Sequence, residues 1–237
     1  MRALVAEFVG AALLLAAVVG SGIMGERLAD GNVALALLAN TLATGAALVA
    51  LILTFGHISG AHFNPAVSLA EASQARLSWR QAGGYVFAQT LGALSGVVLA
   101  HAMFGEPLYS VSHHMRSGFA QVLSEAVATF GLLAVISGCA RHRAGAVPFA
   151  VGAYISAAYW FTSSTSFANP AVTVARALTD TFSGIRPADV PGFLLGQAVG
   201  AAMATTLFRW LMPGLPTVAV RVVAPREQEP VESRGRG

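Results

Sequence analysis

The chain has 237 residues, of which 55% are hydrophobic and only 11% are charged. Soluble domains carry about 25% charged residues, so this composition predicts a protein that lies mostly in a lipid bilayer. The net charge of +3 is small and the arginines are scattered along the chain, which argues against a nucleic-acid-binding protein.

Six stretches are apolar and long enough, at about 20 residues, to cross a bilayer as helices. In chain order they are Ala3–Met24, Val33–Gly56, Ala82–Phe104, Ser117–Ala140, Ala144–Ser163 and Val190–Met212. The first stretch is longer than the apolar part of a usual signal peptide and is closely followed by the second, so we expect it to remain as a helix. The sequence therefore predicts an all-α membrane protein.

The arginines next to the predicted spans divide unevenly between the two sides of the membrane. The side of the N-terminus receives the four arginines of the C-terminal tail and Arg2, Arg76, Arg80, Arg141, Arg143 and Arg209. The other side receives Arg27, Arg116, Arg176 and Arg186. Because arginine accumulates on the cytoplasmic side, we expect a protein of the cell (inner, cytoplasmic) membrane with both termini in the cytoplasm. Residues 213–237, rich in Pro, Gly, Arg and Glu, are expected to form a disordered cytoplasmic tail.

Two further apolar segments, His57–Ser73 and Ser164–Thr179, are only about half as long as a span. Each contains Asn-Pro-Ala-Val, and a Gln-x-x-Gly-Ala sequence beginning at Gln89 or Gln197 follows each copy in the next span. Because an odd number of spans separates the two copies, the second must be inverted relative to the first. We therefore expect one membrane domain over residues 1–212, built from inverted repeats at about 1–104 and 117–212.

The Asn-Pro-Ala motifs predict two short helices that begin near the middle of the membrane. Asparagine is a strong N-cap and proline suits the first helical position. Two half-helices entering from opposite sides would bring their positive N-terminal ends together, which repels cations, while the asparagine amides offer N–H donors to a neutral molecule. The pattern therefore indicates a passage for small uncharged solutes. The motif residues are Asn64, Pro65, Ala66, Asn169, Pro170 and Ala171.

The segment Gly56–Val67, with the sequence Gly-His-Ile-Ser-Gly-Ala-His-Phe-Asn-Pro-Ala-Val, resembles the first re-entrant loop of the aquaporin, or major intrinsic protein, family. The sequence Ala-Glu-Phe-Val-Gly at Ala6–Gly10 resembles the first helix of that family, and the resemblance extends from about Ala3 to Met212. It implies six transmembrane helices plus two re-entrant half-helices in an aquaporin-like inverted repeat. It also implies a homotetramer with one pore per subunit and no cofactor. We find no nucleophile, metal site or acid pair that would indicate an enzyme.

Glu7 and Glu125 are the only acids deep in the predicted spans, at matching positions of the two repeats. Intramembrane acids often relay protons, but the family resemblance implies that each accepts hydrogen bonds from its re-entrant loop. His57 and His62 could suggest a metal site, although their spacing puts them on no common helix face and neither a cysteine nor an acid lies beside them. We expect no metal, and we expect His57 to orient loop carbonyls near the cytoplasmic pore mouth.

Most members of the family carry an arginine directly after the second Asn-Pro-Ala, where this chain has Val172. The resemblance assigns that position to a four-residue constriction near the outer mouth, together with Thr44, Ser166 and either Ala157 or Tyr159. Small side chains here predict a ring that is wider and less polar than in water-selective members. Arg176 follows one helical turn after Val172, so it either faces the pore mouth or extends to the membrane interface.

The expected function is passive conduction of small uncharged solutes: metalloid hydroxides such as arsenous acid, glycerol-like polyols, and water. The sequence Asn-Pro-Ala-Val-Thr, followed by Arg176 and by Asp180–Ile185, resembles a bacterial subgroup linked to arsenic resistance. One alternative is a water-preferring aquaporin. Another is a secondary carrier, since carriers are also built from inverted repeats with broken helices, although they usually have more charges within the membrane.

Overall fold

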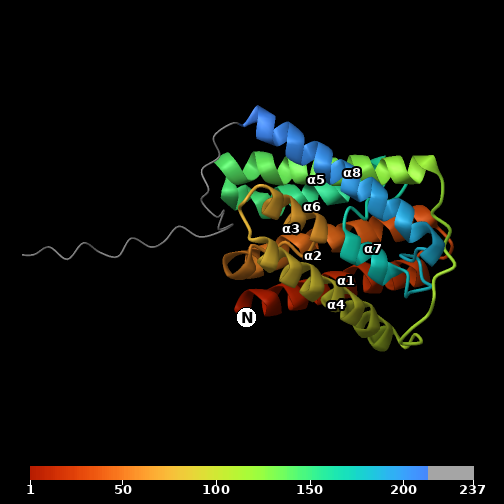
Figure 1. Ribbon diagram of the computed structural model, residues 1–237. Coiled ribbons are helices and arrows are strands. Elements are labelled where there is room, and N and C mark those ends of the chain that lie inside the picture. The colour runs from red at the N-terminus through yellow and green to blue at the C-terminus, as the bar shows by residue number, and fades with distance from the viewer. Residues whose placement is uncertain (213–237) are drawn as a thin grey trace, which may run out of the picture.

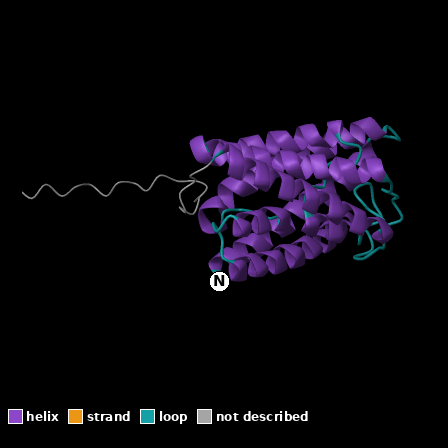
Figure 2. Cartoon of the chain, turned by 45° about the horizontal axis from the view of Figure 1, so that its top comes forward, coloured by secondary structure: helices purple, strands orange, loops and turns teal. Residues whose placement is uncertain are grey.

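The computed structural model describes residues 1–212, and the regular elements in this range are all helical (Figures 1 and 2). Six helices are long and apolar enough to cross a membrane, which confirms the predicted number of spans. They are α1 (Arg2–Leu28), α2 (Val33–Ser59), α4 (Trp79–Phe104), α5 (Phe119–His142), α6 (Val147–Phe161) and α8 (Val190–Leu211). The 3-10 turns η1 (Ala144–Ala146) and η2 (Pro187–Asp189) lead into α6 and α8. The predicted tail, 213–237, lies outside the described residues.

Two short helices, α3 (Pro65–Ser73) and α7 (Pro170–Arg176), lie between the long ones (Figure 1). Each begins with proline after an asparagine whose side chain accepts a backbone N–H of the first turn, as the motif predicts. The nine residues of α3 rise about 14 Å, so a helix of this length crosses only half of a bilayer core of about 30 Å. In Figure 1, α3 points toward the end of the bundle that carries the N-terminus and α7 toward the other end.

Glycines bring the long helices of each half into backbone contact. A Cβ atom at Gly92 in α4 would overlap the carbonyl oxygen of Phe8 in α1. In the second half, a Cβ at Gly200 in α8 would overlap the carbonyl oxygen of Ala126 in α5. Small residues allow such close packing where lipid provides no hydrophobic force between helices. The corresponding helix pairs of the two halves, α1 with α4 and α5 with α8, therefore both pack closely at glycines.

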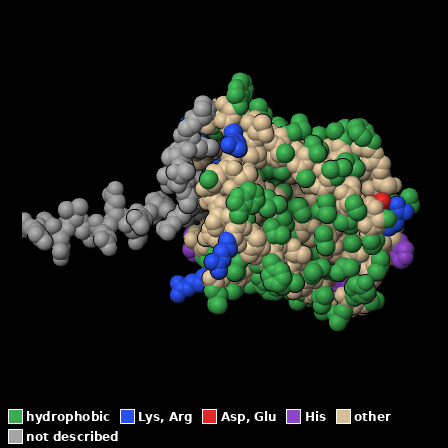
Figure 3. Space-filling view, in the orientation of Figure 1, with side chains coloured by type: hydrophobic (Ala, Val, Ile, Leu, Met, Phe, Trp, Pro, Cys, Tyr) green, Lys and Arg blue, Asp and Glu red, His purple; other side chains and the backbone are tan. Residues whose placement is uncertain are grey.

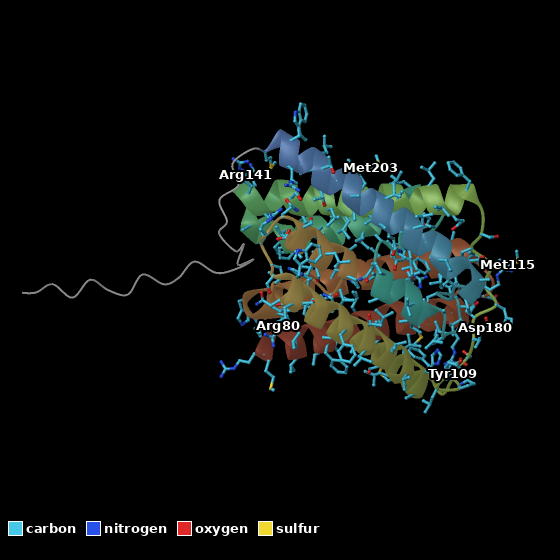
Figure 4. All side chains as sticks on the ribbon, viewed as in Figure 1. Arg80, Tyr109, Met115, Arg141, Asp180 and Met203 are labelled. Carbon is cyan, nitrogen blue, oxygen red and sulfur yellow. The ribbon has the colours of Figure 1, made fainter. Side chains whose placement is uncertain are left out.

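Large apolar side chains cover the sides of the bundle, and arginines gather toward its ends (Figure 3). Exposed examples from different helices are Leu13, Leu42, Phe87, Val127, Phe149 and Leu195. Arg80 and Arg141 lie at the end that carries the N-terminus, which we call the N-terminal face (Figure 4). Tyr109, Met115 and Asp180 lie at the opposite end, which we call the distal face (Figure 4). This distribution suits a bundle whose sides face lipid and whose ends face water.

Candidate functional site

A cavity inside the bundle is lined by residues of both halves, including Asn64 and Asn169. Toward the N-terminal face it is lined by Glu71, in the last turn of α3, and by Arg76, which comes shortly after that helix. On the distal side it is lined by Arg176, the last residue of α7. Its remaining wall is largely apolar, apart from Thr44, His62, Tyr159 and Ser166 and the irregular backbone before each half-helix. Irregular backbone at this depth is tolerated where it lines a cavity.

The two motif asparagines hold the re-entrant loops of opposite halves together. The side-chain nitrogen of Asn64 donates to the carbonyl oxygen of Ala168 at 2.8 Å, and that of Asn169 donates to the carbonyl oxygen of Phe63, also at 2.8 Å. Their side-chain oxygens accept backbone N–H groups of their own helices. An amide nitrogen carries two N–H groups, so each asparagine keeps one donor for a molecule in the cavity.

Glu7 of α1 fixes the first re-entrant loop from behind. One carboxylate oxygen accepts the hydroxyl of Ser59 at 2.6 Å and the backbone N–H of His62 at 3.0 Å. The other accepts the backbone N–H of Phe63 and the side-chain nitrogen of Gln89, both at 2.7 Å. Glu7 is completely buried, and these contacts occupy both of its oxygens.

Glu125 of α5 makes the corresponding contacts with the second loop. One carboxylate oxygen accepts the hydroxyl of Ser164 at 2.6 Å and the backbone N–H of Phe167 at 2.8 Å. The other accepts the backbone N–H of Ala168 at 2.9 Å and the side-chain nitrogen of Gln197 at 2.6 Å. The match between the two acids, contact for contact, is the anchoring geometry that the family resemblance implies.

The anchored loops hold non-glycine residues in the left-handed region of backbone space. Ala61 and Phe63 have φ of 50° and 47°, and their counterparts Ser166 and Ala168 have φ of 51° and 48°. Such angles cost free energy for residues with a Cβ and persist only where surrounding contacts enforce them. The hydrogen bonds to Glu7 and Glu125 supply that enforcement. They keep the loops irregular beside the cavity.

Four of the five residues expected at the constriction line the cavity: Thr44, Tyr159, Ser166 and Val172. The hydroxyl of Tyr159 donates to that of Thr44 at 3.3 Å. The hydroxyl of Ser166 is buried and has no hydrogen-bond partner among the described residues. Ala157 is exposed on the outside of the bundle, because two positions along a helix turn a side chain by about 200°. Of the two candidates for the fourth position, the geometry favours Tyr159.

Arg176 lies on the cavity wall with only 2% of its surface exposed. Its guanidinium carbon lies 3.4 Å from the centroid of the Phe167 ring, and its Nε donates to the carbonyl oxygen of Ser183. The side chain is therefore folded against the pore wall and does not extend to a membrane interface.

Arg116, in the loop before α5, lies 5.1 Å from the same Phe167 centroid. Its Nε donates to the carbonyl oxygen of Gly184 at 2.8 Å, and its backbone N–H donates to the carboxylate of Asp189 at 2.8 Å. Burial lowers the pKa of the Arg116 guanidinium from its usual value, and the nearby Glu125 carboxylate opposes that shift. Arg116 thus ties together the distal loops around the mouth of the cavity.

Comparison with known proteins identifies this arrangement. Residues 1–166 match the sequence model of the family described as major intrinsic protein. The chain belongs to the major intrinsic protein family. It is 56% identical over 218 residues to aquaglyceroporin AqpS of Rhizobium meliloti (strain 1021), a match that covers 92% of this chain and 93% of the relative. It is 34% identical over 185 residues to the probable aquaporin AqpM of Archaeoglobus fulgidus, covering 72% of this chain and 74% of the relative.

The fold also matches a solved structure of the family. The X-ray structure of the aquaglyceroporin from Plasmodium falciparum superposes with a TM-score of 0.67 at 20% identity, over 90% of this chain and 97% of that one. This likeness confirms the expected arrangement of six spans and two half-helices. Proteins of this family are membrane channels, so the chain is a channel rather than an enzyme.

His57 lies in the last turn of α2 and not in the re-entrant segment predicted from His57 to Ser73. It is exposed and absent from the cavity wall, because α2 continues to Ser59, past the predicted end of that span at Gly56. His62 lies on the wall instead, and its Nδ1 is 3.0 Å from the hydroxyl of Ser68. In the described range no three His, Cys, Asp or Glu side chains come close enough to hold a metal ion.

Several residues of the site were not singled out by sequence reasoning. Gln89 and Gln197 each bridge an anchoring acid to a hydroxyl of the half-helix, and their matching places in the repeat could have indicated this role. Glu71 and Arg76 form an ion pair on the cavity wall, with 3.4 Å between Nε and the carboxylate. Arg116 reaches the site from an irregular loop, where no periodicity predicts which way a side chain points.

Proposed function

We propose that this channel conducts small uncharged polyhydroxy solutes, such as glycerol and neutral metalloid hydroxides like arsenous acid, together with water. The observation that carries the proposal is Val172, which lines the cavity where most members of the family place an arginine. With Thr44, Tyr159 and Ser166 it would form a constriction without a charged side chain. Such a ring is wider than one that an arginine side chain partly fills.

The proposed ring has two chemically different sides. Thr44 and Tyr159 contribute hydroxyl groups that both donate and accept hydrogen bonds, and Ser166 is a small polar residue beside them on the cavity wall. Val172 contributes an apolar side. A molecule with several hydroxyls along one edge and none along the other can satisfy both. The 56% identity to a protein named as an aquaglyceroporin also supports this solute class over water alone.

The buried acids support passive conduction over coupled transport. A proton-coupled carrier needs an acid that can gain and lose a proton during transport. Glu7 and Glu125 each accept four hydrogen bonds from fixed groups, two at each carboxylate oxygen. Protonation of either acid would put an O–H where one of these donors is accepted and would cost at least one of the four bonds, so we assign the acids to the scaffold and not to a proton path.

We also propose that residues 1–212 form one channel domain, with repeats at about 1–104 and 117–212, that assembles as a homotetramer in the cell membrane. Both termini would lie in the cytoplasm, since the face that carries the N-terminus also carries Arg80 and Arg141 (Figure 4). Native mass spectrometry of detergent-extracted protein tests the tetramer. Reporter fusions at each terminus test the orientation, and a reporter that is active only outside the cytoplasm should stay silent at both.

Stopped-flow light scattering on proteoliposomes tests the function directly. The purified chain should raise the permeability to glycerol, urea, arsenous acid and water above that of protein-free liposomes. Initial glycerol uptake should rise in proportion to concentration through the millimolar range, without a proton gradient. Water permeation alone would favour a water-preferring aquaporin. A plateau at low millimolar glycerol, or a requirement for a proton gradient, would favour a carrier.

A further inference from the structure

Two arginines line the cavity, one toward each end, and they differ in how their charge is balanced. Arg76 forms an ion pair with Glu71, which also lines the cavity. Arg176 has no carboxylate within ion-pair distance among residues 1–212. Since a guanidinium stays protonated in proteins, Arg176 adds a permanent positive charge to the distal half of the cavity.

The position of this charge is fixed by its surroundings. The Phe167 ring lies against the flat face of the Arg176 guanidinium, and Nε is occupied by the carbonyl oxygen of Ser183. Among residues 1–212, Nε is the only guanidinium nitrogen of Arg176 that donates a hydrogen bond to the protein. A planar cation stacked on an aromatic ring, with its terminal donors free, is preorganised toward the cavity.

A second cation strengthens the field at this place. Arg116 lies on the same Phe167 ring, and its contacts are mainly with backbone carbonyls. The nearest acid on the cavity side, Glu125, is buried behind the re-entrant loop, where it accepts the loop N–H groups. Asp189, the other carboxylate beside Arg116, accepts its backbone N–H and forms an ion pair with Arg186, so it does not balance the charge of Arg176.

We propose that Arg176 is the residue by which this pore rejects cations, in place of the arginine that is missing at Val172. Val172 and Arg176 are one helical turn apart on α7, and the Arg176 side chain is held against Phe167 at the pore wall, so in this proposal the charge acts beside the constriction without filling it. Width and charge would then be controlled by different residues. A pore of this kind admits neutral molecules too large for a ring that contains arginine, and still opposes cations.

Urea and guanidinium provide a matched pair of probes, because they have nearly the same planar shape and differ by one positive charge. The fluxes of both are measured in proteoliposomes with equal amounts of reconstituted protein. Wild-type protein should conduct urea and largely exclude guanidinium. Arg176→Met should raise the guanidinium-to-urea permeability ratio about ten-fold, the effect expected from removing one nearby charge in a partly aqueous pore. Arg176→Lys should keep the ratio within about three-fold of wild type.

Arg27→Met is the matched control. Arg27 ends α1, pairs with Glu106 and is 48% exposed, so this variant loses the same charge outside the cavity. Its ratio should equal that of wild type. If Arg176→Met folds poorly, Arg176→Cys in a Cys139→Ser background is labelled after reconstitution. A cationic aminoethyl thiosulfonate should restore exclusion of guanidinium, and a neutral methyl reagent should not.

The inference deepens the proposed channel function, and the two fail differently. A wild-type protein that conducts neither urea nor glycerol contradicts the proposed function. A wild-type ratio in Arg176→Met with normal urea flux, or equal effects of the two thiol reagents, contradicts the role of Arg176 and leaves the channel intact.

Discussion

Glu7 and Glu125 hold the two re-entrant loops by the same set of contacts, whereas the two half-helices end in different ways. The last turn of α3 contains Glu71, and Arg76 follows the helix, with 3.4 Å between its Nε and the Glu71 carboxylate. The end of α7 is Arg176, whose charge no carboxylate of the described chain pairs. Contacts that occur in both halves form the scaffold at the centre of the membrane. Features found in only one half distinguish the two ends of the cavity.

The cavity wall beside the two Asn-Pro-Ala motifs also differs between the halves, although the residue after each motif is the same. Val67 and Val172 are equivalent in the repeat, and both line the cavity. Thr44, Tyr159 and Ser166 lie on the cavity wall with Val172, and the hydroxyls of Thr44 and Tyr159 are hydrogen-bonded to each other. We therefore assign recognition of the solute to the distal half of the pore.

Removal of either anchoring acid should have the largest effect on stability and solute flux, and the effect should be similar for the two acids. Glu7→Ala or Glu125→Ala leaves four hydrogen-bond donors without their acceptor. Each unsatisfied buried donor costs about 1–3 kcal/mol, so we expect the free energy of unfolding to fall by at least about 3 kcal/mol, with loss of solute flux. Thermal unfolding in detergent measures this, with exposed Glu26→Ala as control. Tolerance of one substitution but not the other would contradict the equivalence of the halves.

Replacing either motif asparagine with aspartate should have a smaller effect and tests the electrostatics at the middle of the membrane. Asn64→Asp and Asn169→Asp each replace an amide that donates to the opposite loop with a carboxylate that cannot donate. We expect about ten-fold lower glycerol permeability and a measurable cation leak, because the new negative charge offsets the positive helix ends. Proteoliposome flux assays check both quantities, and Asn32→Asp, at the exposed cap of α2, is the control. Wild-type permeability without a leak in both variants would contradict this account of the midplane.

A loop contact on the distal face should have the smallest effect. Asp180 accepts the backbone N–H of His113 at 2.8 Å and lies 2.9 Å from its Nδ1, and these bonds lower the pKa of Asp180 below its usual value. Its contribution to stability is fully present above the unfolded pKa of about 4 and is lost as the pH falls through the lower folded value.

Asp180→Ala should therefore lower the thermal midpoint slightly at pH 7, with no difference from wild type near pH 2. Glycerol flux at pH 7 should not change, since Asp180 does not line the cavity. Unfolding scans at the two pH values provide the test. A larger difference at the acidic pH would mean that the bond to His113 does not act as described.

The sequence was sufficient for the spans and half-helices because the length of an apolar stretch and a repeated capping motif act locally. It left Ala157 and Tyr159 open because counting across a loop does not give the rotation of α6 about its axis. It assigned His57 to the re-entrant segment because the apolar pattern does not show that α2 continues to Ser59. The Arg176 side chain packs against the ring of Phe167, which lies outside α7, so no pattern within α7 indicates this contact.

The most direct test of the separation between width and charge is to move the arginine by one helical turn. Val172→Arg alone should raise the ratio of water to glycerol permeability, since a long cationic side chain narrows the proposed ring. Arg176→Val alone should leave that ratio low and admit guanidinium. The double variant Val172→Arg/Arg176→Val, measured in matched proteoliposomes with water, glycerol, urea and guanidinium, should exclude guanidinium again while glycerol permeability falls relative to water. A double variant that admits guanidinium as freely as Arg176→Val, or that keeps the wild-type water-to-glycerol ratio while folded, would contradict the account.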